Sequence, residues 1–222
     1  GARREPPVTF TIAPLTHDEV EDYAHTHIEL TIGTYAHLVD AEFARARRAE
    51  LAERVADLHA DVDACTSLDA HPDGSFRADA AVPLPRDPSI GGPLSGPHAC
   101  VQTHFRRHFI ARNARGGVVG VAASGIGVGD WEIDVCGDAW VPPATDWTLD
   151  HLYTVTGMHG SGLGQAMLDA ALPGRRPAYL WVFTDNVRAV RFYERNGFVP
   201  DGLKVDSGES WGSMPMVRMQ RA

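Results

Sequence analysis

The pattern of apolar and polar residues predicts a first set of strands. Residues 8–12 alternate between apolar and polar side chains, which is typical of a strand with one buried face. Residues 101–112 and 118–128 predict two further strands joined by a turn at 113–117, and residues 147–155 predict another. The glycines within 118–128 indicate a β-bulge in that strand. The middle of the chain is therefore expected to be mainly β.

Apolar residues at helical spacing follow the first strand. They predict a helix near 17–36 that starts at a capping box at 16–19 and bends or ends around Gly33. A second helix is expected over 41–62, with Asp40 as its N-cap. Two helices should therefore separate the first strand from the second.

Proline and glycine interrupt the regular pattern in two places. Residues 64–100 are rich in both and predict a long loop or insertion, which is either functional or disordered. Residues 129–145 are also expected to form a loop, since they contain Pro142 and Pro143.

The last third of the chain alternates between helices and strands. One helix is expected after Gly162, and another runs from Asn186, a good N-cap, to Asn196, with Gly197 directly after it. The strands are predicted at 178–183, 198–204 and 214–220. The element order β-α-α-β-β-β-α-β-α-β-β predicts a mixed α/β (α+β) fold.

Length and charge narrow the classes of function. The 222 residues suit a single domain over 1–222 with one core. The formal net charge of −9 argues against nucleic acid as the main partner and favours a cationic acceptor such as an amine. No apolar run approaches the roughly 20 residues of a membrane span, so no membrane partner is expected.

Cysteine usage and the first residues indicate a reducing compartment. The start of the sequence lacks the apolar stretch of a signal peptide. Cys65, Cys100 and Cys136 are widely spaced and form no C-x-x-C pair, so free thiols in the cytoplasm are expected. The histidine spacings do not suit a metal site, and no metal is expected.

A glycine-rich turn at 159–164, His-Gly-Ser-Gly-Leu-Gly, lies between a predicted strand and a predicted helix. Such a turn directs backbone N–H groups at one point, where the helix dipole adds positive charge, and it suits phosphate oxygens. The turn lacks the lysine of a Walker loop and the spacing of a dinucleotide fingerprint. Taken alone, it is equally compatible with a plain tight turn.

A second block makes the turn more specific. Asn186 precedes the helical pattern Ala-x-x-Phe-Tyr-x-x-x-Gly-Phe at 189–198, and Leu-Tyr-Thr-Val at 152–155 leads into the turn. Together these segments closely resemble the GNAT superfamily of acetyltransferases. The turn matches the family motif R/Q-x-x-G-x-G/A except at its first position, which is His159. The resemblance covers about residues 147–220, and the first half agrees in element order only, with 64–100 as an insertion.

The resemblance implies a fold, an activity and a binding site. The expected fold is a central, mostly antiparallel sheet flanked by helices and splayed between its fourth and fifth strands. The expected activity is N-acetyltransferase, from acetyl-CoA to a primary amine, with the pantetheine arm in the splay. The implied binding groups are the backbone of Tyr153, Thr154 and Val155, the turn residues His159 and Gly160, the amides of Ser161, Gly162, Leu163, Gly164 and Gln165, the Asn186 side chain, and Tyr193.

The chemistry needs a base and an acid. A lysine-like amine has a pKa near 10.4 and must lose a proton before it attacks, whereas a thiolate leaves with modest acid assistance. The resemblance implies Tyr193 as the general acid. The candidates for the base are Asp150 and His151, and a water relay is the alternative.

The sequence is compatible with three functions. Besides the enzyme, the fold suits a CoA-binding regulatory module without catalysis, and the turn alone suits a nucleotide-dependent oxidoreductase. For the enzyme, the acceptor is a small-molecule amine or a protein amine, and a homodimer is left open.

Overall fold

A computed structural model describes residues 9–67 and 105–222, and the segments 1–8 and 68–104, with most of the expected insertion, lie outside it. None of the described helices has both the length and the apolar content that crossing a bilayer requires. The strands are β1 (Phe10–Pro14), β2 (Phe105–Asn113), β3 (Val118–Ile126), β4 (Trp147–Thr154), β5 (Ala178–Phe183), β6 (Val199–Asp206) and β7 (Pro215–Arg221). The α-helices are α1 (Val20–Tyr35), α2 (Ala41–Ala49), α3 (Leu51–Ser67), α4 (Asp130–Cys136), α5 (Leu163–Ala171) and α6 (Val187–Arg195).

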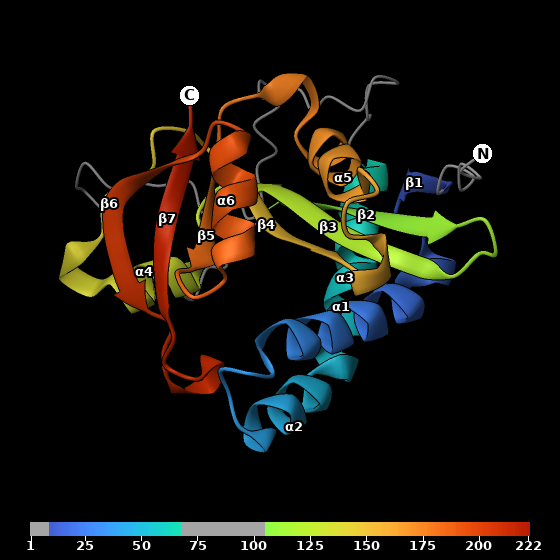
Figure 1. Ribbon diagram of the computed structural model, residues 1–222, viewed down its shortest axis with the longest axis horizontal. Coiled ribbons are helices and arrows are strands. Elements are labelled where there is room, and N and C mark those ends of the chain that lie inside the picture. Colours follow the sequence, from blue (N-terminus) through green and yellow to red (C-terminus); the bar gives the residue numbers. More distant parts are fainter. Residues whose placement is uncertain (1–8, 68–104) are drawn as a thin grey trace, which may run out of the picture.

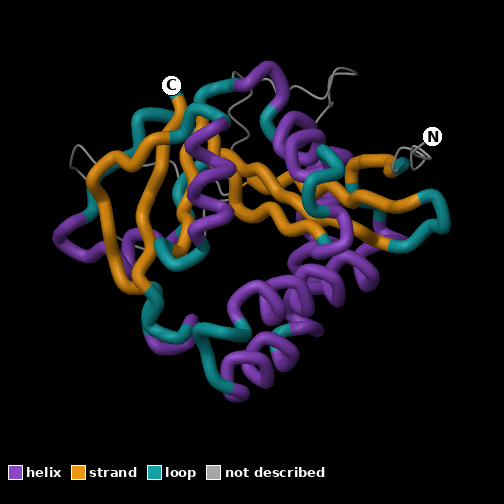
Figure 2. Tube along the Cα trace, in the orientation of Figure 1, coloured by secondary structure: helices purple, strands orange, loops and turns teal. Residues whose placement is uncertain are grey.

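The described strands form one sheet in the order β1-β2-β3-β4-β5-β7-β6. Its neighbours are antiparallel except for β4 and β5. These two parallel strands pair only at Thr148–Tyr179 and Leu149–Leu180, and then diverge (Figures 1 and 2). The predicted mixed fold with a splayed, mostly antiparallel sheet is confirmed. The expected bulge in β3 is also present, at Val119.

Helices cover both faces of the β1–β4 half of the sheet (Figure 1). On one face, α5 packs so closely that a Cβ on Gly120 of β3 would lie 2.6 Å from the sulfur of Met167. On the other face, α1 and α3 share a core with β3 through Tyr23, Leu58 and Val121. The α6 helix packs against β5. This arrangement places the starts of α5 and α6 on either side of the divergence between β4 and β5.

The start and the end of the first helix differ from the prediction. The Thr16 hydroxyl donates to Asp18 Oδ1 (2.6 Å) and caps no backbone amide, so the expected capping box is wrong. The α1 helix runs through Gly33 and ends at Tyr35. It continues because Tyr35 is buried, only 5% exposed, in a cluster that holds the last turn in place.

The predicted second helix is two helices that meet at Glu50. Asp40 caps the first of them as expected, since its Oδ1 accepts hydrogen bonds from two first-turn amides. The Glu50 carboxylate binds Arg47 of α2 (2.8 Å) and Arg54 of α3 (2.9 Å), which secures the junction. The helix divides because α2 packs Arg47 over the ring of Trp211, whereas α3 packs against α1 and β2.

Part of the segment expected to be a loop at 129–145 is helical. The Glu132 side chain accepts a hydrogen bond from the Gly129 amide (3.0 Å) at the start of α4. The same carboxylate, 2% exposed, accepts from the Tyr179 hydroxyl (3.0 Å) and from Trp181 Nε1 (2.8 Å) on β5. These bonds satisfy a buried charge and fix α4 to β5. Glu132 is therefore a structural anchor of the short helix.

Candidate functional site

A cavity of about 1230 Å³ occupies the divergence between β4 and β5. Residues of α1, α3 and β2 line one side of it, and residues of α5, β5 and α6 line the other. The glycine-rich turn, Asn186, Tyr193, Asp150 and His151 all border this one space. The structure thus brings the predicted cofactor-binding and catalytic candidates together.

A second β-bulge, in β4, lies where this strand leaves β5. Leu149 pairs with Ser124 and His151 pairs with Ala123, so Asp150 is the extra residue. Consecutive side chains on a regular strand point to opposite faces, and a bulge changes that alternation. The bulge lies within the stretch Thr148–Thr154, all of which lines the cavity.

The glycine-rich turn leads into α5 with two residues in the left-handed conformation. Gly160 has φ +83° and Gly162 has φ +89°, which glycine adopts without strain. A Cβ on either residue would meet no atom within 4 Å, so both face open space. The first helical bond of α5 joins Ala166 N to Gly162 O (3.0 Å), which leaves the amides of Gly164 and Gln165 ahead of the helical ladder. Such amides suit an anion.

Three amides of the expected binding set are bonded within the protein. Ser161 N donates to Met158 O (3.1 Å), and Leu163 N donates to Ser161 Oγ (3.3 Å). Val155 N donates to Val119 O (2.9 Å) and completes the ladder with β3. The groups with the best access to a ligand are therefore the glycines of the turn and the cavity edge of β4.

His159, the position that departs from the motif, lies beside an arginine of α6. Arg188 Nη1 is 2.5 Å from His159 Nδ1 and 2.6 Å from Nε2. Burial and the Arg188 charge lower the pKa of His159 below its usual 6.5. The imidazole is therefore neutral at pH 7, and Arg188 carries the positive charge next to the turn. Sequence reasoning missed Arg188, because its place opposite the turn depends on how α6 packs.

Asn186 is the N-cap of α6, as predicted. Its Oδ1 accepts a hydrogen bond from the Ala189 amide (3.2 Å), and its side chain also bonds to the Tyr35 hydroxyl. The Tyr35 hydroxyl lies 3.4 Å from that of Tyr153 on β4. Asn186 and Tyr153 therefore border the cavity from opposite sides, bridged by a residue of α1.

Tyr193 is held by aromatic contacts and faces the same cavity. Its ring packs edge-on against Phe192 (5.4 Å between centroids) and Phe198 (5.8 Å), and the residue is 7% exposed. Burial, followed by repulsion from Tyr153, raises the pKa of its phenol well above the usual 10. The phenol therefore keeps its proton at neutral pH.

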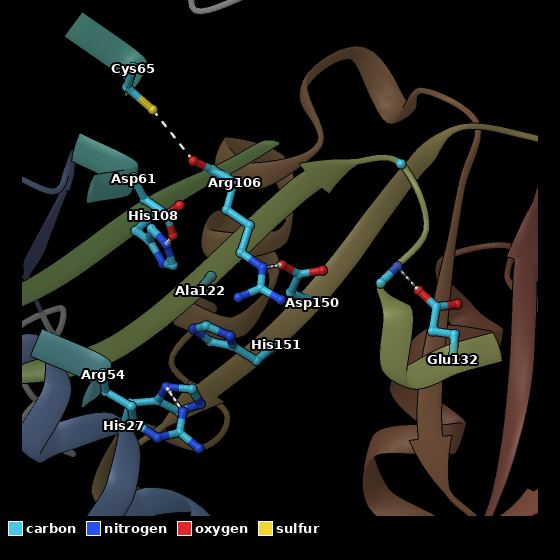
Figure 3. A network of polar contacts seen from close by, with 12 residues as sticks. His27, Arg54, Asp61, Cys65, Arg106, His108, Ala122, Glu132, Asp150 and His151 are labelled. Atoms are coloured by element: carbon cyan, nitrogen blue, oxygen red, sulfur yellow. Dashed lines mark hydrogen bonds and ion pairs between the residues drawn. The ribbon is translucent and has the colours of Figure 1, made fainter. Parts of the chain in front are cut away.

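His151 lies in a network of polar side chains that reaches from α1 to β4 (Figure 3). Its ring stacks on His27, with centroids 3.8 Å apart and an angle of 21° between the planes. Its Nε2 is 2.7 Å from the Tyr23 hydroxyl, which also contacts His108 Nδ1 (3.2 Å). His108 Nε2 is 2.7 Å from Asp61 Oδ2. The sequence did not indicate these partners, because they come from three separate elements, α1, α3 and β2.

The other candidate base, Asp150, is ion-paired. Its Oδ2 lies 2.7 Å from Arg106 Nε of β2, next to His151 (Figure 3). Burial lowers the pKa of His151 well below 6.5, and His27, His108, Arg54 and Arg106 lower it further. His151 is therefore neutral at pH 7, as a base must be before it accepts a proton.

The described part of the chain shows no cluster of side chains suited to a metal ion. No group of three or more His, Cys, Asp or Glu side chains is arranged there to hold a metal ion. Cys65 and Cys136 are free thiols, and burial raises the pKa of the Cys65 thiol to about 11.

Comparison with known proteins identifies a domain in the second half of the chain. Residues 104–200 match the model of the acetyltransferase (GNAT) domain family. A search of curated proteins found no match.

Solved structures share the fold at low sequence identity. The N-acetyltransferase PaiA from Thermoplasma acidophilum, solved in complex with coenzyme A, is 14% identical, with 95% of this chain and 98% of that chain covered and a TM-score of 0.56. YjaB from Escherichia coli, solved in its apo form, is 13% identical, with 96% and 98% covered and a TM-score of 0.53. At these identities the likeness establishes the fold alone.

Proposed function

Because the chain carries a GNAT acetyltransferase domain, we propose that it acts as a single-domain N-acetyltransferase that moves the acetyl group of acetyl-CoA to a primary amine. One observation carries this proposal. A single cavity joins an anion-binding turn at the start of α5 to a protonated phenol, Tyr193, and a neutral imidazole, His151. Acetyl transfer to an amine needs these three features in one place.

The residues present fit acetyl-CoA. The open glycines 160 and 162 leave room for a diphosphate, which the amides of Gly164 and Gln165 would bind at the positive end of α5. Arg188 adds a cation there, beside His159. The edge of β4 beyond Leu149, at Tyr153 and Thr154, is unpaired with β5 and would bind the pantetheine amides, with Asn186 opposite.

His151 is the better of the two candidates for the base. The Asp150 carboxylate is already engaged by Arg106, 2.7 Å from Arg106 Nε. His151 is neutral and has one ring nitrogen beyond its contact with Tyr23. We therefore assign to His151 the removal of a proton from the acceptor amine, and to Asp150 a supporting position in the bulge.

Tyr193 and β4 act at the other end of the reacting bond. The bound acetyl-CoA supplies an activated acyl group and a thiol leaving group. A backbone N–H of β4 beyond Leu149 stabilises the charge that develops on the acyl oxygen, and Tyr193 donates its proton to the departing sulfur. The acceptor ammonium loses one proton to His151, which releases it to solvent, and a second once its nitrogen is bonded to the acyl carbon, which returns through solvent to Tyr193. One turnover thus converts the ammonium and the thioester into an amide, a thiol and one proton.

A turnover screen tests the proposed function. The chain is incubated with acetyl-CoA and a set of small amines and lysine-containing peptides, while release of free thiol and formation of acetylated product are measured together. Product from at least one amine supports the proposal. Tight CoA binding without product from any amine would refute it in favour of a CoA-binding module, and stronger binding of NAD than of CoA would favour an oxidoreductase.

A further inference from the structure

The contacts of the Tyr23 hydroxyl determine which nitrogen of His151 carries a proton. This hydroxyl lies 2.9 Å from the backbone oxygen of Ala122, 2.7 Å from His151 Nε2 and 3.2 Å from His108 Nδ1. A phenol has one proton to donate and two lone pairs to accept. The three contacts therefore cannot all take the same role.

The contact with the carbonyl oxygen of Ala122 decides where the Tyr23 proton points. This oxygen accepts hydrogen bonds and never donates them, so two oxygens at 2.9 Å need the Tyr23 proton between them. Whether or not the longer contact with His108 Nδ1 (3.2 Å) shares this proton, it does not lie toward His151 Nε2, at 2.7 Å from the same hydroxyl, so Nε2 must be the donor. We propose that Tyr23 is a positioning residue that holds His151 as its Nε2–H tautomer, so that Nδ1 is the nitrogen that takes the amine proton.

The inference rests on the proposed function, in which His151 is the base. Without Tyr23, a neutral histidine exchanges between two tautomers, and only one of them leaves Nδ1 free. In a catalytic triad a carboxylate orients the base, and here a neutral phenol takes that place. Burial, followed by Asp150 and Asp61, raises the pKa of Tyr23 well above 10, so the phenol keeps the proton on which the arrangement depends.

The His108–Asp61 pair holds Tyr23 in place. His108 is 6% exposed, and its Nε2 donates to Asp61 Oδ2 over 2.7 Å. Its ring packs edge-on against Tyr23, with centroids 5.3 Å apart. Tyr23 itself is fully buried, so its ring has one fixed position. The chain of contacts runs from a partly exposed carboxylate on α3 to Nε2 of His151.

The groups that face His151 come from every element around it. They are Tyr23 and His27 of α1, Arg54 and Asp61 of α3, Arg106 and His108 of β2, and Asp150 and Tyr153 of β4. Of these, Tyr23 alone has a hydrogen-bond contact to a His151 ring nitrogen among residues 9–67 and 105–222. The choice of tautomer is therefore assigned to Tyr23.

The first test reads the tautomer directly and needs no acceptor. Long-range ¹H–¹⁵N correlation spectra of the histidine-labelled protein at neutral pH distinguish Nε2–H from Nδ1–H, and His151→Gln assigns the signals. We expect His151 to be the Nε2–H tautomer in the wild type and a mixture, or the Nδ1–H form, in Tyr23→Phe. An Nδ1–H tautomer in the wild type, or an unchanged Nε2–H tautomer in Tyr23→Phe, would overturn the inference.

The second test is kinetic. Tyr23→Phe should lower kcat by the factor by which the Nε2–H population of His151 falls, about twofold for an even mixture and about tenfold or more where Nδ1–H predominates, with an unchanged KM for acetyl-CoA. Tyr179→Phe is the matched control, because it removes a buried hydroxyl outside the cavity lining and should keep both kcat and the His151 tautomer. A wild-type chain that acetylates no amine would refute the proposed function, whereas the spectra decide the tautomer independently.

Discussion

Replacing Tyr193 with phenylalanine removes one oxygen atom and separates catalysis from packing. The aromatic contacts to Phe192 and Phe198 remain, because neither involves the hydroxyl. The hydroxyl faces the cavity, and within residues 9–67 and 105–222 no hydrogen-bond partner is assigned to it, so its loss leaves no buried group unpaired. We expect the free energy of unfolding to change by less than about 1 kcal/mol.

The expected loss in rate follows from the leaving group. A thiol has a pKa near 8.5, so at neutral pH its departure needs only modest help from an acid. The loss should therefore be about tenfold or more, equivalent to at least ~1.4 kcal/mol in the barrier, toward the lower end of general acid catalysis. Since the phenol pKa is raised well above 10, Tyr193 should also cause no loss of activity up to pH 10.

The assay measures kcat, the KM for acetyl-CoA and the thermal midpoint for Tyr193→Phe and for Tyr179→Phe. Tyr179 donates to the buried carboxylate of Glu132 over 3.0 Å, so its variant should lose about 1.5–3 kcal/mol of stability and keep its kcat. The two variants should thus show opposite patterns, one losing rate and the other losing stability. A Tyr193→Phe enzyme with the kcat of the wild type would refute the role of the phenol as the acid.

Three further variants and a pH profile test other parts of the site. Arg188→Ala should raise the KM for acetyl-CoA about tenfold with little change in kcat, because the charge beside the turn acts on binding; an unchanged KM would show that this arginine does not contact the phosphates. Gly162→Ala should cost about 1–2 kcal/mol of stability, because φ is +89° there, and should weaken CoA binding as measured by calorimetry; equal affinity would argue against a diphosphate at the turn. The acid limb of kcat/KM should lie below pH 6.5, since the proposed base is the unprotonated His151 and activity is lost as the pH falls through its lowered pKa. Arg54→Met removes one of the cations that lower this pKa and should move the limb to higher pH; a limb that stays in place or moves down would contradict His151 as the base.

The features predicted well from the sequence depend on local chemistry. The glycines at 160 and 162 adopt positive φ, Asn186 caps α6, and the strand at 178–183 has the bounds expected from its apolar run. Each of these signals lies within a few residues of the structure that it specifies. The splay between β4 and β5 was implied by resemblance, since no local pattern indicates where two parallel strands separate.

The features that the sequence did not reveal depend on distant contacts. Glu132 starts a helix because Tyr179 and Trp181, on a strand much later in the chain, satisfy its carboxylate. The α2–α3 break at Glu50 likewise follows from two packing directions, and propensity favours one continuous helix there. Propensity is a weak prior that tertiary contacts override, and both errors are of this kind.

The two halves of the site differ in the same way, because one depends on local sequence motifs and the other on distant contacts. The proposed donor half, with the turn, Asn186 and Tyr193, is built from residues 153–193 and carries the recognisable motifs. The half proposed to face the acceptor is assembled by α1, α3 and β2 around His151, through Tyr23, Asp61 and His108. The binding site for a donor that a whole family shares keeps its sequence motif. An acceptor that differs between members is recognised by side chains from elements that are free to vary. Substitutions in α1 and α3 should therefore change which amine is used, while the affinity for acetyl-CoA stays with the turn.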